Sequence, residues 1–135
     1  MLLDTSGLLC FLLKNEPKHA TANRLIAETN GIFLTHNYIL AELVALSLVR
    51  GFPQITMLSY ILELGNNPKV EIVWVDQLLY QEAMTLLLTR QDKTYSLCDA
   101  VSFVLMRQRG VMDALTTDKH FEQEGFVRLL KPDSQ

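Results

Sequence analysis

Residues 96–123 read SLCDAVSFVLMRQRGVMDALTTDKHFEQ, and most of the architecture can be inferred from them. A helix is expected over residues 96–109, because its last turn is cationic and a glycine follows. Residues 114–117 form a short strand pattern that ends at Asp118, and a one-turn helix is expected over residues 119–123. A helix, a buried strand, an acid and a second helix in this order are typical of a parallel α/β sheet with helical crossovers.

The same alternation of strand and helix patterns extends over the rest of the chain. Glycine, asparagine or proline separates the apolar runs. The other expected strands lie at residues 1–3, 32–35, 70–75 and 126–130, and the other expected helices at residues 8–13, 17–29, 38–49, 53–64 and 77–90. We therefore predict a single three-layer α/β/α domain over residues 1–135 with a mostly parallel sheet. Trp74, within an expected strand, is predicted to lie in the core.

Composition narrows the class of protein. The chain has 135 residues and a formal net charge of −3, which argues against nucleic-acid binding by bulk positive charge but not against a local acidic metal site. Cys10 and Cys98 lie in apolar stretches without CxxC spacing, so buried thiols and a cytoplasmic location are expected. No basic segment precedes the run at residues 8–13 and no apolar run reaches ~18 residues, so we expect neither a signal peptide nor a membrane span.

Four acids stand alone in apolar surroundings: Asp4, Glu42, Asp99 and Asp118. Acidic side chains are rarely buried unless they are paired or bound to a cation. Asp4 and Asp118 follow expected strands, and ligands of open α/β sheets bind beyond the carboxyl ends of the strands. Glu42 and Asp99 are expected in first helical turns that can lie at the same edge. Four carboxylates converging there would need a hard cation, Mg²⁺ or Mn²⁺.

Each acid also has a purely structural interpretation. Ser96 and Asp99 match a capping box, in which each side chain bonds the other residue's backbone N–H. Asp4 and Asp118 can cap the helices that follow them, and Glu42 can complement a helix dipole. These interpretations are compatible with metal binding, because one carboxylate can bind a cation while its neighbours cap.

Hydroxyl and cationic residues flank the acids. Ser6 and Thr117 can cap helices or orient carboxylates that bind a metal. Lys119 and His120 directly follow the last acid, which makes them the candidates for contact with a substrate phosphate.

The chain resembles a PIN domain of the VapC-like toxin type. Four segments carry the resemblance: LLDTSGLL at 2–9, the EL of ILAELVALSL at 39–48, SLCDAVSFVLM at 96–106 and LTTDKHFEQEGF at 115–126. The resemblance implies a parallel sheet flanked by helices and an acidic site that binds Mg²⁺ or Mn²⁺. It also implies hydrolysis of RNA phosphodiester bonds by an endoribonuclease.

The resemblance also implies roles for particular residues. The metal ligands or catalytic acids would be Asp4, Glu42, Asp99 and Asp118, which occur in the family's order and spacing. Ser6 and Thr117 stand where members of the family often place a supporting hydroxyl.

The expected function is therefore that of the toxin of a type II toxin–antitoxin pair. Two alternatives remain open, a catalytically weak PIN-like domain that binds protein or RNA and another metal-dependent nuclease. The helices expected at residues 38–49 and 53–64 are apolar on all sides, which predicts a homodimer and a small antitoxin partner. These helices can instead pack on each other within a monomer. The RNA target and the number of metal ions are left open by the sequence.

Overall fold

Five parallel strands form one sheet in the order β3-β2-β1-β4-β5. The computed structural model describes residues 1–133. The strands are β1 (Leu2–Leu3), β2 (Phe33–His36), β3 (Val70–Val73), β4 (Asp113–Leu115) and β5 (Val127–Arg128). Parallel pairing requires a crossover between successive strands, and helices supply each one. The parallel α/β sheet expected from the sequence is confirmed.

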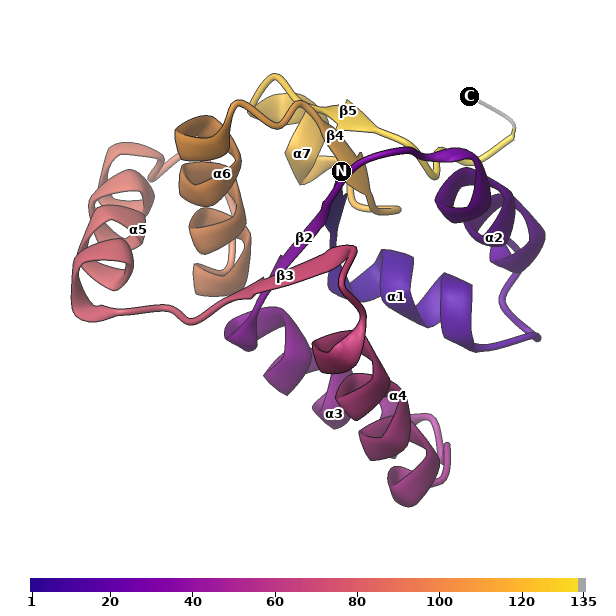
Figure 1. The fold of residues 1–135 in the computed structure, drawn as a ribbon. Helices are drawn as coiled ribbons and strands as arrows, with labels where there is room; N and C mark the ends of the chain where they lie inside the picture. Colours follow the sequence, from indigo (N-terminus) through magenta and orange to yellow (C-terminus); the bar gives the residue numbers. More distant parts are fainter. Residues whose placement is uncertain (134–135) are drawn as a thin grey trace.

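Seven helices flank this sheet within the described residues (Figure 1). They are α1 (Thr5–Leu12), α2 (His19–Glu28), α3 (Asn37–Val49), α4 (Gln54–Asn66), α5 (Gln77–Thr89), α6 (Leu97–Arg109) and α7 (His120–Gln123). In Figure 1, α5 and α6 lie together on one side of the sheet, and α1 and α2 lie on the other. The α3–α4 pair projects beyond the sheet, which leaves part of its surface unpacked.

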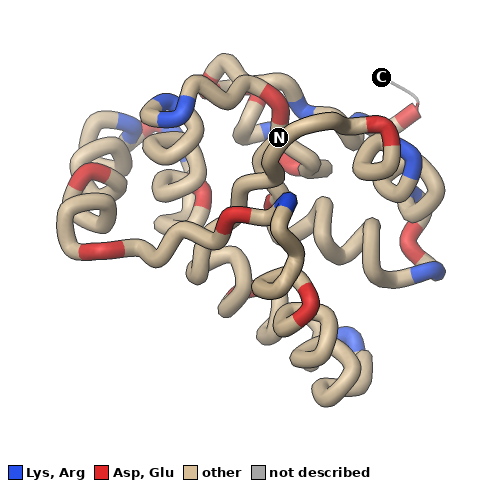
Figure 2. Tube along the Cα trace, in the orientation of Figure 1, with Lys and Arg blue, Asp and Glu red and all other residues tan. Residues whose placement is uncertain are grey.

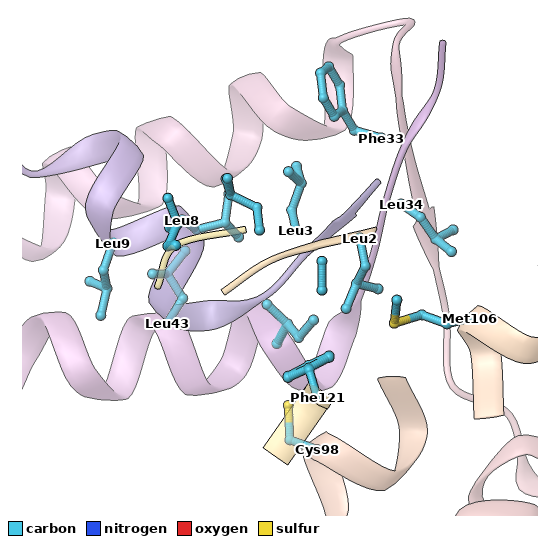
Figure 3. Close-up of a cluster of buried hydrophobic side chains, with 14 of the residues drawn as sticks. Leu2, Leu3, Leu8, Leu9, Phe33, Leu34, Leu43, Cys98, Met106 and Phe121 are labelled. Carbon is cyan, nitrogen blue, oxygen red and sulfur yellow. The ribbon is translucent and has the colours of Figure 1, made fainter. Parts of the chain in front are cut away.

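The core surrounds the central strand β1, which is buried on both faces. Leu2 and Leu3 lie among side chains from α1, α3 and α6 (Figure 3). Leu43 of α3 and Met106 of α6 are fully buried in this cluster. Packing on both faces of β1 fixes the position at which the strand ends, and Asp4 follows directly.

Gly7 permits a close contact between α1 and the end of β4. A Cβ atom at this position would lie 1.9 Å from the carbonyl oxygen of Leu115. Any larger residue would push the first turn of α1 away from β4. This approach brings Asp4 and Ser6, which lie at the start of α1, next to the residues that follow β4.

Three local expectations were wrong. Trp74 is 70% exposed, because β3 is an edge strand that ends at Val73 and the chain leaves the sheet there. The first helix starts at Thr5 rather than at residue 8, since the Leu8 N–H already donates to the Asp4 carbonyl. Glu42 lies in the second turn of its helix, because α3 begins directly after β2.

Both cysteines are buried and free, as expected. Among the described residues, no helix combines the length and the apolar character needed to cross a membrane.

Candidate active site

The four isolated acids of the sequence meet at the carboxyl edge of the sheet. Asp4 follows β1, and its backbone N–H donates to Leu115 at the end of the adjacent β4, 3.2 Å away. Asp118 lies three residues beyond β4. The charges of Asp99 and Glu42 both act on Asp4, and the charge of Asp118 acts on Asp99. The structure therefore places the four side chains near enough for their charges to interact, with Asp99 and Asp118 the closest pair.

Asp4 is the most deeply placed of the four, with 6% of its surface exposed. Its carboxylate does not cap α1, which removes the capping interpretation for this residue. Burial, and then the charges of Asp99 and Glu42, raise the pKa of Asp4 to about 7, although a hydrogen bond from Thr116 opposes the shift. Near neutral pH, this carboxylate is thus held at the point of losing its proton, where a bound cation would favour the charged form.

Asp99 both caps α6 and belongs to the acidic cluster. The predicted capping box is present, with the Ser96 N–H donating to Asp99 Oδ2 at 3.1 Å and the Asp99 N–H donating to Ser96 Oγ at 3.0 Å. Burial, foremost, and the nearby Asp118 raise the pKa of Asp99. The capping and metal-binding interpretations therefore coexist in one residue.

Asp118 joins the cluster through His120. The backbone N–H of His120 donates to Asp118 Oδ1 at 2.9 Å, although the N-cap position of the short helix α7 is Lys119 and not Asp118. The ring Nδ1 of His120 lies 3.4 Å from Asp118 Oδ1 and 3.1 Å from Asp99 Oδ2. One ligand atom from each of these three residues lies within 4.8 Å of the others, a separation that fits a shared cation.

Glu42 approaches the cluster from α3 and is half-buried. Its charge acts on the nearby Cys98 thiol. Burial, followed by the charges of Glu42 and Asp4, raises the pKa of Cys98 well above its usual range. The thiol beside the acids is therefore a protonated donor and not a nucleophile.

A network of hydroxyls ties Asp4 to the loop after β4. Thr116 Oγ1 donates to Asp4 Oδ2 at 2.7 Å and accepts from the Asp118 N–H at 3.0 Å. Ser6 Oγ lies 3.4 Å from Asp4 Oδ2 and accepts from the Thr117 N–H at 3.0 Å. Ser6 therefore lies beside Asp4 and is tied to the loop after β4.

The hydroxyl of Thr116 was missed by the sequence analysis, which pointed to Thr117. Thr117 contributes its backbone N–H to the network, and the threonine hydroxyl on Asp4 comes from Thr116. The reason is that β4 ends at Leu115, two residues earlier than predicted, so the side chains after it alternate in a different register. To choose Thr116 from the sequence, one would need to know that β4 ends at Leu115, and the sequence pattern of residues 114–117 does not show this.

The donor set suits a hard divalent cation. Four carboxylates from four separate elements converge, and among residues 1–133 no lysine or arginine forms an ion pair with any of them. Carboxylate oxygens are the ligands that Mg²⁺ and Mn²⁺ prefer. Clustered acids without a cationic side chain are unfavourable unless they protonate or bind a cation.

Known proteins resemble this chain in sequence and in fold. The sequence profile of the PIN domain matches residues 1–126. The chain is 30% identical over 127 residues to the 23S rRNA-specific endonuclease VapC20 of two Mycobacterium tuberculosis strains, which covers 94% of this chain and 95% of that protein. The crystal structure of M. tuberculosis VapC20, described as a sarcin–ricin loop cleaving toxin, superposes with a TM-score of 0.84 at 28% identity, over 97% of this chain and 98% of the other.

Proposed function

This chain belongs to the PIN-domain family, and we propose that it is a metal-dependent endoribonuclease of the VapC toxin type. The observation that carries the proposal is the convergence of four carboxylates at the edge of the sheet without a lysine or arginine partner among the described residues. The likeness to an rRNA-specific endonuclease over nearly the whole of both chains supports the reaction class.

Asp4, Asp99 and Asp118 are proposed as the main ligands of Mg²⁺ or Mn²⁺. PIN-domain nucleases are metal-dependent, and the oxygen donors of this site fit either ion. Such an ion, when bound, lowers the pKa of water and neutralises charge that develops on a phosphodiester. Glu42 is less buried than Asp4, so its proposed role is to bind the metal through water or to accept the proton of the attacking water.

RNA is the proposed substrate, and Lys119 is the proposed phosphate contact. Lys119 is exposed and directly follows Asp118, so its ammonium can reach a phosphate at the site. The ring nitrogens of His120 both face protein groups, Asp99 and Thr94, which favours a supporting role for this residue over direct phosphate contact. The likeness to VapC20 makes a 23S rRNA loop the first substrate to assay.

A second copy of the chain and a small antitoxin are the proposed protein partners. The α3–α4 pair carries only three charged residues in its 30-residue span, which leaves most of its length uncharged (Figure 2). Large apolar side chains on its surface are exposed, among them Val49, Ile55 and Leu62. Burial of this surface by a copy related by a two-fold axis is expected to give about twice the 15.4 kDa mass in light scattering at micromolar concentration. A monomeric mass would overturn the homodimer.

We also propose a cytoplasmic location, since both thiols are free.

Cleavage assays test the proposed function directly. The purified chain should cut RNA in Mg²⁺ or Mn²⁺, lose activity in EDTA, and recover it when excess metal is restored. A binding module would instead retain RNA in a mobility-shift assay without cutting it. Cleavage that persists unchanged in EDTA would overturn the metal-dependent mechanism.

A further inference from the structure

The carboxylate side chain of Glu124 is shielded from solvent, and it lies outside the four-acid cluster. Its side chain is 3% exposed at the end of α7. Arg90 Nε donates to it at 3.0 Å, Arg107 Nη2 at 2.9 Å and the Tyr95 hydroxyl at 2.9 Å. A carboxylate with this many donors is charged and held in a single orientation. Glu124 therefore joins the ends of α5, α6 and α7 to the loop that contains Tyr95.

That loop connects Glu124 to the acidic cluster. The Tyr95 ring packs edge-on against the His120 ring, with centroids 5.2 Å apart. Thr94 Oγ1 lies 3.3 Å from His120 Nε2. Two consecutive residues thus contact the same imidazole, one on its face and one on its nitrogen. Because Glu124 holds the Tyr95 hydroxyl, it also limits how far this loop can move from His120.

The imidazole in turn orients Asp99. A carboxylate only accepts hydrogen bonds, so His120 Nδ1, 3.1 Å from Asp99 Oδ2, carries a proton and donates to it, while Nε2 lies 3.3 Å from Thr94 Oγ1. The Ser96 N–H donates to the same oxygen of Asp99. Both donors bond the same oxygen, Oδ2, so together they hold the Asp99 carboxylate in one orientation.

We propose that Glu124 is a positioning residue for the active site, acting through Tyr95 and His120 on the Asp99 carboxylate. The inference rests on the proposed function, because the oriented oxygen is that of a proposed metal ligand. Groups that hold a ligating carboxylate from behind commonly change metal affinity or activity by 10–100-fold when they are removed. The contacts of the Glu124 side chain are with Arg90, Arg107 and Tyr95 and not with the four acids, so its effect is on geometry and not on the chemical step itself.

Conservative variants test this role. Glu124→Gln keeps the shape and removes the charge, and Tyr95→Phe removes only the hydroxyl that Glu124 holds. Each should weaken Mn²⁺ binding about tenfold, measured by electron paramagnetic resonance without RNA, and lower kcat about tenfold at unchanged KM for RNA. The double variant should be no worse than Glu124→Gln alone, because the effect of Glu124 on the site passes through the Tyr95 side chain.

Glu71→Gln is the matched control. Glu71 pairs with Arg109 at 2.6 Å, on the exposed surface and at the far end of α6 from Asp99, so this variant should keep Mn²⁺ affinity and kcat within twofold. Assays run well below each melting temperature keep any unfolding out of the result, and Tyr95→Phe tests the link if Glu124→Gln does not fold. Wild-type Mn²⁺ affinity in both Tyr95→Phe and Glu124→Gln would overturn the positioning role alone. A wild-type protein that neither binds Mn²⁺ nor cuts RNA would overturn this inference together with the proposed function.

Discussion

Asp4 and Glu124 are both buried carboxylates, but their surroundings are opposite. Asp4 lies among hydroxyls and other acids, and burial is the main reason that its pKa rises to about 7. Burial also acts to raise the pKa of Glu124, but hydrogen bonds from Arg90, Arg107 and Tyr95 outweigh it and hold that pKa below its usual value. The charge of Glu124 is balanced by arginine side chains of the protein. The charge of Asp4 has no such partner, so its protonated form is favoured.

The difference separates a structural acid from a functional one. The guanidinium groups of Arg90 and Arg107 balance the charge of Glu124, so this carboxylate needs no bound ligand to be stable in the protein. The cluster around Asp4 has no lysine or arginine partner among the described residues, only the His120 imidazole beside Asp99 and Asp118, and a divalent ion would favour the charged form of Asp4. A buried acid without a cationic partner is thus a more specific sign of a metal site than an acid that is merely buried.

Replacement of one acid in the uncompensated cluster should have the largest effect. Asp99→Asn keeps the shape and the capping hydrogen bond of α6 but removes a charge that would bind metal. We expect a loss of RNA cleavage of about 100-fold or more, with a change in the free energy of unfolding of at most ~1 kcal/mol. Cleavage rates and thermal melts on the same sample measure both quantities.

Asp76→Asn is the control for this change. Asp76 caps α5 through a hydrogen bond from the Leu79 N–H at 2.9 Å, and it is a structural cap of the same chemical type. Its replacement should leave cleavage within twofold, since asparagine caps as well as aspartate. Equal activity in the Asp99 and Asp76 variants would mean that Asp99 serves only as a cap.

The sheet and the acids could be inferred from sequence because each rests on a local pattern. Short apolar runs followed by helices predict parallel strands, and parallel strands place the residues after them at one edge. Asp4 and Asp118 were located by that rule, whereas Asp99 and Glu42 were located by their isolation in apolar helices. The structure brings the four side chains close enough for their charges to interact.

What the sequence could not supply depends on the ends of elements and on distant partners. Glu124 looks like an ordinary acid in a polar turn, and its arginines lie 17 and 34 residues away. The contact at Gly7 depends on how closely α1 approaches β4, although the residue itself resembled a turn glycine. Trp74 was misplaced by a strand that ends one residue before it. Each miss concerns a tertiary contact that no local pattern encodes.

The raised pKa of Asp4 predicts a pH-dependent stability difference between the wild type and Asp4→Asn in EDTA. Between its unfolded value of 3.8 and its folded value of about 7, folded Asp4 binds a proton that the unfolded chain has released. Stability from this group is therefore present at low pH and lost as pH rises through 7. The advantage of Asp4→Asn over the wild type should grow by on the order of 2 kcal/mol between pH 5 and pH 8.

Denaturant titrations of both proteins at the two pH values measure this difference. Buried His36, whose pKa burial lowers to about 3, contributes the opposite pH trend, but it is common to both proteins and cancels. Added Mg²⁺ or Mn²⁺ should stabilise the wild type at pH 8 and have much less effect on Asp4→Asn. A difference that stays constant from pH 5 to pH 8 would mean that Asp4 titrates normally.

The smallest expected effect distinguishes the two threonines after β4. Thr116→Val removes a buried hydroxyl that donates to Asp4 and accepts from the Asp118 N–H, whereas the N–H that Thr117 donates to Ser6 survives in Thr117→Val. Thr116→Val should cost ~1–2 kcal/mol of stability, because it leaves a buried carboxylate and a backbone N–H without that partner. It should also lower cleavage about tenfold, as expected for a group that orients a ligand. Thr117→Val should stay within ~0.5 kcal/mol of the wild type in urea titrations. The reverse order of the two variants would restore Thr117 as the supporting hydroxyl, as the sequence alone suggested.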